Sequence, residues 1–144
     1  MSHSEEGSEM ADISELKAAA ERAMGSGDFG AIAGLLKDYG SDDFVEEWPQ
    51  SGERLTRDMV EKMAEYPQLS GTSPKFTYKR MIGGGDVFVA EGTIDYGDGI
   101  PVSYVGIGEI RDGKVFRMTE YFANPFEPPE WRKGMTQRME PAPA

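Results

Sequence analysis

The second half of the chain carries the pattern that most restricts its fold. Between Lys75 and Phe122, stretches rich in β-branched and aromatic residues alternate with short turns rich in glycine and aspartate. These stretches are 75–82, 87–96, 102–111 and 114–122. Turns this short join antiparallel strands, because a parallel pair needs a long crossover connection. We therefore expect four long antiparallel strands, the last two joined by a hairpin at Asp112-Gly113.

The first part of the chain indicates helices. Asp12 followed by Glu15 is a capping-box pattern, and apolar residues then recur at helical spacing until Gly25-Ser26-Gly27 ends the run. Asp28 caps a second, shorter helix. Its apolar side would carry Phe29, Ile32, Leu35 and Leu36.

A short strand and a third helix link the two halves. We expect the strand at about 44–48, where Pro49 ends it. Thr56 then caps a helix that stops at Pro67. Its inner face would carry Met59, Val60, Met63 and Tyr66. Helices followed by a run of strands predict an α+β domain, with three N-terminal helices on a mainly antiparallel sheet.

Glycines within the predicted strands suggest that the sheet curls. Gly92, Gly106 and Gly108 occupy mid-strand positions, where a flat sheet would carry side chains. A curled sheet has a concave face that the helices can close into a cone, and such an interior commonly binds small molecules. The outer face keeps apolar residues such as Val87 and Val89, so we expect a homodimer through the sheet.

Composition excludes several kinds of chemistry. The chain has no cysteine, and its single histidine, His3, lies in a polar N-terminal stretch. Disulfides, thiolate or histidine metal sites, cysteine nucleophiles and a Ser-His-Asp triad are therefore excluded, and we expect neither metal nor cofactor. A net charge of −11 disfavours nucleic acid and anionic membranes as partners. Carboxylates, hydroxyls, amides and aromatic rings remain for any chemistry.

The length of 144 residues corresponds to one domain. We expect the domain at residues 12–132, between a disordered N-terminal tail (1–11) and a C-terminal tail (133–144). The N-terminal stretch lacks the basic start and apolar run of a secretory signal, and no window is apolar enough to span a membrane. The expected location is the cytoplasm.

Three local sequences, taken with the order of elements, point to a family. They are Trp48-Pro49, Glu-Ile-Arg-Asp-Gly-Lys at 109–114, and Thr-Glu-Tyr-Phe at 119–122. Over about residues 14–126 the chain resembles the SnoaL-like branch of the nuclear transport factor 2-like superfamily. Its members include polyketide cyclases, ketosteroid isomerase, limonene-epoxide hydrolase, scytalone dehydratase and non-enzymatic binding modules. The resemblance implies a cone-shaped fold, a pocket and a dimer more firmly than an activity.

The family's catalytic residues are only partly present. The Arg and Asp of limonene-epoxide hydrolase fall on Gly92 and Ile94, so the pair that activates water is missing. The general base of ketosteroid isomerase falls on Trp48. The acid of the closing strand is retained as Glu120, which alternates with Met118 and Phe122 on the face expected to line the cone.

The short strand leaves one choice open. Glu47 and Trp48 are neighbours, so on a regular strand they point to opposite faces. The resemblance favours Glu47 and Val45 as cavity residues, because they align with the hydrolase's Asn and Tyr. A bulge before Pro49 would turn Trp48 inward instead. If Glu47 and Glu120 both faced the cavity, they would form a carboxylate pair able to share a proton.

Tyr104 lies on the same strand face as Gly106 and Gly108, the set that faces the pocket by the resemblance. Its hydroxyl could stabilise oxygen charge that develops on a substrate. Tyr78 and Tyr96 are similar, but their faces depend on register. The expected catalytic residues are thus Glu120, Glu47 and Tyr104, and the expected ligand contacts are Trp48, Val45, Tyr96, Ile94, Met118 and Phe122.

Two classes of function fit this pattern. One is a cofactor-free isomerase, cyclase, dehydratase or hydrolase that acts on a small apolar molecule by carboxylate acid/base chemistry. The other is a non-catalytic ligand-binding or dimerisation module of the same fold. Two facing carboxylates in the cavity would favour the enzyme, and a single carboxylate would favour the binding module. A pure scaffold would fill the cone with its own side chains.

Overall fold

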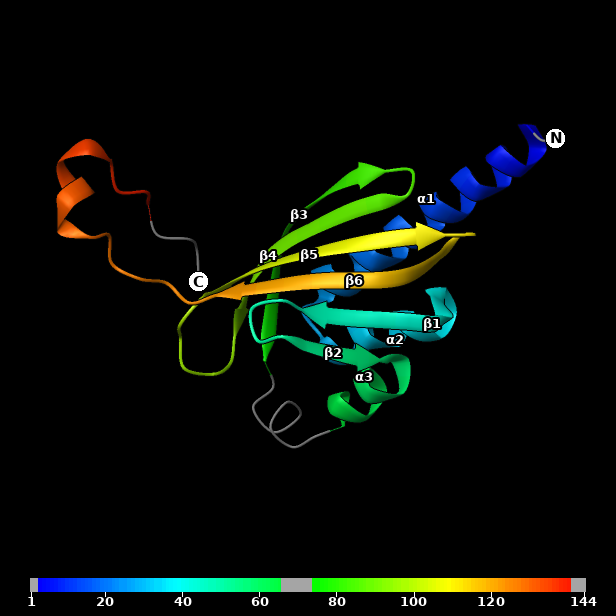
Figure 1. The fold of residues 1–144 in the computed structure, drawn as a ribbon, viewed down its shortest axis with the longest axis horizontal. Coiled ribbons are helices and arrows are strands. Elements are labelled where there is room, and N and C mark those ends of the chain that lie inside the picture. The colour runs from blue at the N-terminus through cyan, green and yellow to red at the C-terminus, as the bar shows by residue number, and fades with distance from the viewer. Residues whose placement is uncertain (1–2, 66–73, 141–144) are drawn as a thin grey trace.

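The structure is a computed structural model that describes residues 3–65 and 74–140. Two α-helices come first, then two strands, a third helix and the four remaining strands of a curled sheet (Figure 1). The helices are α1 (His3–Ser26), α2 (Phe29–Tyr39) and α3 (Arg57–Ala64). The strands are β1 (Gly40–Trp48), β2 (Glu53–Thr56), β3 (Lys75–Gly84), β4 (Val87–Asp95), β5 (Val102–Arg111) and β6 (Lys114–Ala123), and a 3₁₀ helix η1 (Glu130–Met135) follows them.

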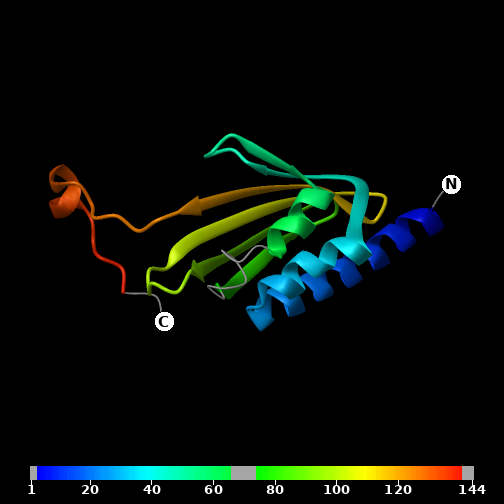
Figure 2. The same ribbon diagram turned by 90° about the horizontal axis from the view of Figure 1, so that it is seen from below.

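All the strands named above belong to one sheet, in the order β2-β1-β6-β5-β4-β3. Neighbouring strands are antiparallel except β1 and β6, which run parallel. The helices cover one face of the sheet, and no other element of the described residues lies on the opposite face (Figure 2). The prediction of an α+β fold with helices on a curled, mainly antiparallel sheet is confirmed.

Two predicted helix caps are present. The carboxylate of Asp28 accepts a 2.9 Å hydrogen bond from the backbone N–H of Gly30, at the start of α2. The hydroxyl of Thr56 accepts one of 3.4 Å from the N–H of Met59, at the start of α3. Each cap satisfies a backbone donor that the first helical turn leaves without an intrahelical partner.

Helix α1 begins at His3, so the predicted start at Asp12 is wrong. The added segment contains Glu5, Glu6 and Glu9, and acidic residues near a helix N-terminus interact favourably with the helix dipole. Whether residues 1–11 and 133–144 behave as dispensable tails stays a prediction.

The strands agree with the expected ranges in the second half and differ in the first. Strand β5 spans the predicted 102–111, whereas β1 begins at Gly40 rather than at residue 44. Strand β2 was not predicted, because it is short and only Leu55 in it is buried. Met63 and Val60 of α3 line the cavity described below, but Met59 is exposed. Tyr66 and Pro67, the expected end of this helix, lie outside the described residues.

The β5–β6 hairpin forms at the predicted turn. Asp112 has φ 54° and Gly113 has φ 75°. Two consecutive residues in this left-handed region define the tight turn whose twist matches that of antiparallel strands. The Asp-Gly pair therefore sets Arg111 against Lys114, and a bulge between Glu109 and Ile110 shifts the register by one residue along the rest of the hairpin.

The core lies between the helices and the concave face of the sheet. Leu16, Ala20 and Met24 of α1 pack against inward-facing residues of the strands. Phe44 and Ile94 are the largest fully buried side chains of the described part of the chain. None of the helices in the described ranges is both long and apolar enough to cross a bilayer.

Candidate functional site

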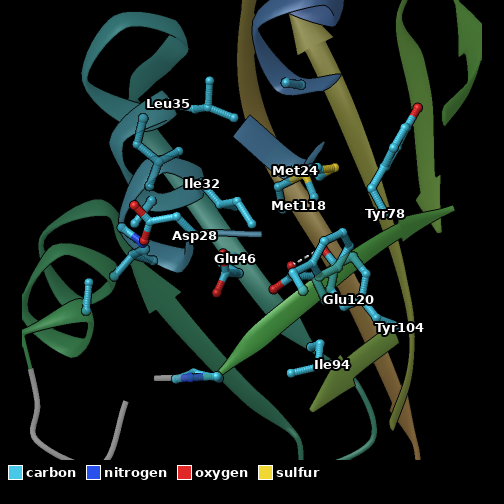
Figure 3. Close-up of a pocket in the computed structure, with 18 of the residues that line it drawn as sticks. Met24, Asp28, Ile32, Leu35, Glu46, Tyr78, Ile94, Tyr104, Met118 and Glu120 are labelled. Atoms are coloured by element: carbon cyan, nitrogen blue, oxygen red, sulfur yellow. Dashed lines mark hydrogen bonds between the residues drawn. The ribbon is translucent and has the colours of Figure 1, made fainter. Parts of the chain in front are cut away.

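A cavity of about 1540 Å³ lies between the helices and the concave sheet face. Most of its lining is apolar, with residues such as Leu16, Ile32 and Ile94. Polar side chains from several elements also reach it, among them Asp28, Glu46, Tyr78, Tyr104 and Glu120 (Figure 3). Trp48, Gln50, Lys75 and Tyr96 line it as well. A mostly apolar cavity with a few convergent polar groups is the usual form of a small-molecule site.

Strand β1 presents alternate residues to this cavity. Phe44, Glu46 and Trp48 line it, whereas Val45 and Glu47 do not. Trp48 therefore points inward, whereas the resemblance to the family favoured Glu47 in that place. Gly40 also lines the cavity, so β1 alternates regularly from there to its end, and Trp48 is turned inward without a bulge before Pro49.

The predictions that Glu47 and Val45 face the cavity are wrong. Glu47 accepts two hydrogen bonds from Arg54, the shorter being 2.8 Å from Nη2 to Oε2. Its other oxygen, Oε1, lies 3.6 Å from Nε of Arg117. Val45 pairs in register with Thr56 and Arg117 on the same outer side. Both residues lie on the outer face because strand side chains alternate.

Glu120 lines the cavity and accepts hydrogen bonds from two aromatic side chains. The Tyr104 hydroxyl donates to Oε2 of Glu120. The indole Nε1 of Trp48 donates to Oε1 at 2.9 Å. The carboxylate is thus held from both sides, by β5 and by β1, and its position in the cavity is fixed (Figure 3).

Gly106 makes the contact between Tyr104 and Glu120 possible. It lies directly opposite Glu120 in the β5–β6 register and two residues after Tyr104 on the same face. A Cβ atom at Gly106 would collide with the Tyr104 hydroxyl and would lie 3.0 Å from Cε of Met118. The missing side chain therefore leaves the space that the tyrosine needs in order to lean along β5 to the carboxylate.

Glu46 is the cavity carboxylate that sequence reasoning missed. It pairs in register with Met118 on β6, two residues before Glu120. Burial, the charge of Glu120 and a hydrogen bond with Glu120 together raise the pKa of Glu46 from 4.5 to about 9, and burial is the largest of these causes. Near neutral pH Glu46 is therefore a neutral carboxyl group beside a carboxylate. Strict alternation from an inward Trp48 would have identified it.

The tyrosines of the cavity stay protonated. Burial, followed by the charge of Glu120 and the hydrogen bond to it, raises the pKa of Tyr104 well above its ordinary value. Burial and the same charge also raise the pKa of Tyr96. Burial and the charge of Glu21 raise the pKa of Tyr78. Their hydroxyls can therefore act as hydrogen-bond donors.

The remaining predicted contacts surround the carboxylates. Ile94, Tyr96, Met118 and Phe122 all line the cavity. The Phe122 ring meets Trp48 edge-on at 6.0 Å between centroids and lies 5.6 Å from the Tyr104 ring. These rings form an aromatic wall next to Glu120.

Charged partners for the two carboxylates are scarce. Among the described residues that line the cavity, Lys75 is the only cation, and it is exposed. In the described ranges no group of three or more His, Cys, Asp or Glu side chains is arranged to hold a metal ion. The cavity polarity thus comes from carboxyl groups, hydroxyls and the indole N–H.

The amino-acid sequence of this chain matches that of a known domain family. A model of the SnoaL-like domain matches residues 16–118. The chain belongs to the SnoaL-like family. The resemblance inferred from the sequence is therefore confirmed. Among curated proteins, none matches this chain.

Solved structures show the same fold. A nuclear transport factor 2-like protein of unknown function from Burkholderia xenovorans is 34% identical, with 90% of this chain and 97% of that chain covered and a TM-score of 0.68. A candidate ketosteroid isomerase from Kribbella flavida is 22% identical, with 92% and 93% covered and a TM-score of 0.73. A candidate polyketide cyclase from Sinorhizobium meliloti is 17% identical, with 74% and 93% covered and a TM-score of 0.53. At 22% and 17% identity, the similarity to the latter two structures shows a shared fold alone.

Proposed function

We propose that this SnoaL-like protein binds a small, largely apolar ketone and moves a proton on the carbon next to the carbonyl, without a cofactor. The observation that carries the proposal is the pair Glu46 and Glu120, which line one apolar cavity where the pKa of Glu46 is raised to about 9. Pairs of carboxyl groups whose environments separate their pKa values are how enzymes assign acid and base roles near neutral pH.

Each carboxyl group has a separate role in this reaction. The Glu120 carboxylate takes the proton from the carbon beside the carbonyl. The neutral Glu46 carboxyl donates a hydrogen bond to the carbonyl oxygen, where negative charge develops as the enolate forms. Return of the proton to the same carbon or to a conjugated one completes an exchange or an isomerisation. Protons balance, and no oxidant, reductant or metal is needed.

Tyr104 and Trp48 act as positioning residues. Both donate hydrogen bonds to Glu120, so they hold its carboxylate in one orientation and limit its motion toward solvent. Correct placement of a general base is worth as much as its basicity, because the reacting atoms must lie close together. We also propose that Ile94, Tyr96, Met118 and Phe122 contact the apolar body of the ligand.

The alternative is a binding module of the same fold. Two carboxyl groups in one cavity favour catalysis over binding alone, since a neutral apolar ligand does not require a pair of buried acids. A scaffold filled by its own side chains does not fit a cavity of about 1540 Å³. We further propose that the protein is a cytoplasmic homodimer whose subunits meet through the outer sheet face.

The test uses 2-tetralone, an apolar ketone with exchangeable hydrogens beside its carbonyl. Exchange of these hydrogens for deuterium in D₂O is followed by proton NMR with the wild-type protein and with Glu46→Gln and Glu120→Gln. We expect each variant to exchange about 10²–10⁴-fold more slowly than wild type, the usual contribution of one general acid or base. Glu47→Gln is the matched control, because this neighbouring acid lies on the outer face, and it should exchange like wild type.

Two results would count against the enzyme. Exchange by wild type that is no faster than exchange by Glu120→Gln would leave the binding module as the better account. Loss of exchange in Glu47→Gln equal to that in Glu46→Gln would show that the effect does not come from the cavity. Native mass spectrometry of the freshly purified protein would then identify a bound molecule.

A further inference from the structure

The C-terminal arm, residues 124–140, packs on no part of its own domain. It leaves the sheet at the end of β6 and extends beyond the sheet, away from the helices, in both ribbon views (Figures 1 and 2). Its large apolar side chains are almost fully exposed: Phe126 77%, Trp131 74%, Met135 78% and Met139 89%. Burial of each such side chain typically contributes about 1.5–3 kcal/mol, so an exposed series of them marks a contact surface.

The arm is ordered by its own contacts. Lys133 forms a 2.8 Å ion pair with Glu130 in η1, and Arg138 lies 3.6 Å from Glu127. The hydroxyl of Thr136 donates to the backbone carbonyl of Arg132. In the described part of the chain, the hydrogen bonds and ion pairs of the arm's side chains all join arm residues. The arm therefore has a defined shape before it meets any partner.

Prolines hold the arm away from its own cavity. Pro125, Pro128 and Pro129 lie between β6 and η1, and Pro129 has the extended backbone angles φ −63° and ψ 149°. Proline-rich segments are stiff and extended, because the ring fixes φ. A stiff connection that leads away from the sheet favours contact with another molecule over a return to the same one.

The arm and the cavity mouth have complementary chemistry. Lys133 and Arg138 pair with Glu130 and Glu127 of the arm itself, whereas in the described part of the chain no ion pair involves Arg132, which lies beside Trp131. At the end of β4 lies the mouth patch, which we define as Asp95, Tyr96, Asp98 and Ile100. Tyr96 lines the cavity and is 37% exposed, and Ile100 is 45% exposed.

The two acids of the mouth patch are held in place by the loop itself. Asp95 accepts hydrogen bonds from the N–H groups of Gly97 and Gly99, and Asp98 accepts one from Ile100. The loop thus presents exposed apolar side chains together with fixed carboxylates. That combination suits a partner segment that joins a large apolar side chain to a cation, as Trp131 and Arg132 do.

We propose that the C-terminal arm docks on the mouth patch of a second copy of this chain and closes its cavity. Trp131 packs against Tyr96 and Ile100 of the other copy, while Arg132 lies near Asp95 and Asp98. Twofold symmetry makes the exchange reciprocal, so each copy completes the binding site of the other. Closure excludes water from the cavity and strengthens the electrostatic interactions of its carboxyl groups.

This contact is compatible with a dimer through the outer sheet face. If the twofold axis runs along the strands, the mouth ends of both sheets lie at the same end of the dimer. The arm of each copy then emerges beside the mouth of the other. An axis across the strands would place the arms at the opposite ends and is excluded by the proposal.

Crosslinking tests the contact directly, because the chain contains no cysteine. One batch carries Met135→Cys in the arm, and a second, ¹⁵N-labelled batch carries Ile100→Cys in the mouth patch. The two are mixed and treated with a short bis-maleimide, and mass spectrometry counts crosslinked dimers with one chain of each kind. Ile82→Cys is the matched control, since Ile82 is 52% exposed on β3 at the other end of the sheet.

We expect mixed dimers from Met135→Cys with Ile100→Cys and about tenfold fewer from Met135→Cys with Ile82→Cys. Equal yields from both pairs, or no mixed dimer, would overturn the proposal. So would an intrachain link as the main product of a chain that carries both Met135→Cys and Ile100→Cys. The inference rests on the proposed function, because it takes the cavity as the binding site. Crosslinking nevertheless detects the contact between the copies independently of the result of the ketone exchange.

A second measurement separates docking from a chance encounter. Trp131→Ala removes the proposed anchor without touching the cavity of its own copy. Buried tryptophans often dominate an interface, so the yield of the Met135–Ile100 mixed dimer should fall at least tenfold. An unchanged yield would show that Trp131 does not anchor the arm.

Discussion

The indole Nε1 of Trp48 donates a 2.9 Å hydrogen bond to Oε1 of Glu120, although 72 positions separate the two residues in the chain. The parallel pairing of β1 with β6 brings them together. Because the acceptor is a carboxylate, this bond is stronger than one between neutral groups. It links the end of β1 to the proposed base of the site.

Trp48→Phe tests this link, because it keeps an aromatic ring beside Phe122 and removes the donor. We expect the free energy of unfolding to fall by about 1–2 kcal/mol and deuterium exchange of 2-tetralone to fall about tenfold. Urea denaturation and NMR provide the two measurements. Ser41→Ala, which removes an exposed donor to Asp43 outside the cavity, is the control for stability. A Trp48→Phe protein with wild-type stability and exchange would contradict the positioning role.

The space above Gly106 gives a second prediction. The methyl group of Gly106→Ala would collide with the Tyr104 hydroxyl, so we expect the protein to lose about 1–3 kcal/mol of stability and the tyrosine to move away from Glu120. Gly34→Ala in α2 is the matched control, since nothing lies within 4 Å of its Cβ position. There the helix should gain up to about 1 kcal/mol. Thermal unfolding in which both variants shift alike would refute this account of Gly106.

The raised pKa of Glu46 predicts how the free energy of unfolding depends on pH. Its pKa is about 9 in the folded protein and near 4.5 when unfolded, so between these values the folded state holds one more proton. The free energy of unfolding contributed by Glu46 therefore falls as pH rises through this window. Glu46→Gln removes the effect. Relative to wild type, the variant should gain about 2–4 kcal/mol between pH 5 and pH 8.

Urea denaturation at several pH values measures this gain. Glu47→Gln is the control, because Glu47 is paired with Arg54 outside the cavity and its loss should give no gain that grows with pH. If the difference between Glu46→Gln and wild type is the same at pH 5 and pH 8, Glu46 is not a buried neutral acid.

The outer sheet face supports the proposed dimer. Val87 is 43% exposed and Tyr121 is 41% exposed there, on β4 and β6. Tyr121→Asp places a charge in this face, so sedimentation equilibrium should show a dimer for wild type and at least a tenfold weaker one for the variant. Asp58→Asn, on the helix layer, is the control. A wild-type monomer at micromolar concentration would remove the claim.

More of the fold than of the candidate site could be predicted from the sequence. Alternating strands and the Asp112-Gly113 turn defined β5 and β6 closely, because a tight turn fixes both the register and the ends of a hairpin. The short strand β2 carries only one buried residue, Leu55, and such a strand gives no periodic signal. Its existence depends on pairing with β1, which local sequence does not encode.

The prediction of the site was wrong by one residue on β1, where Glu46 rather than Glu47 lines the cavity. Glu46 and Glu47 are adjacent and chemically identical, and only the face of the strand distinguishes a cavity acid from a surface ion pair. A shift of one residue moves every side chain of a strand to the other face. Glu120 and Tyr104 do line the cavity, as the family resemblance implies, although a bulge between Glu109 and Ile110 shifts the β5–β6 register by one residue from that at the turn.

A titration of the glutamate side-chain carboxyl carbons by ¹³C NMR tests the central claim most directly. The account predicts one carbon signal, absent from Glu46→Gln, that titrates near pH 9 in the wild-type protein. In Glu120→Gln the same signal should titrate at lower pH, because the neighbouring charge is gone while burial remains. If the signal lost in Glu46→Gln titrates near 4.5 in wild type, the two acids do not form the proposed pair.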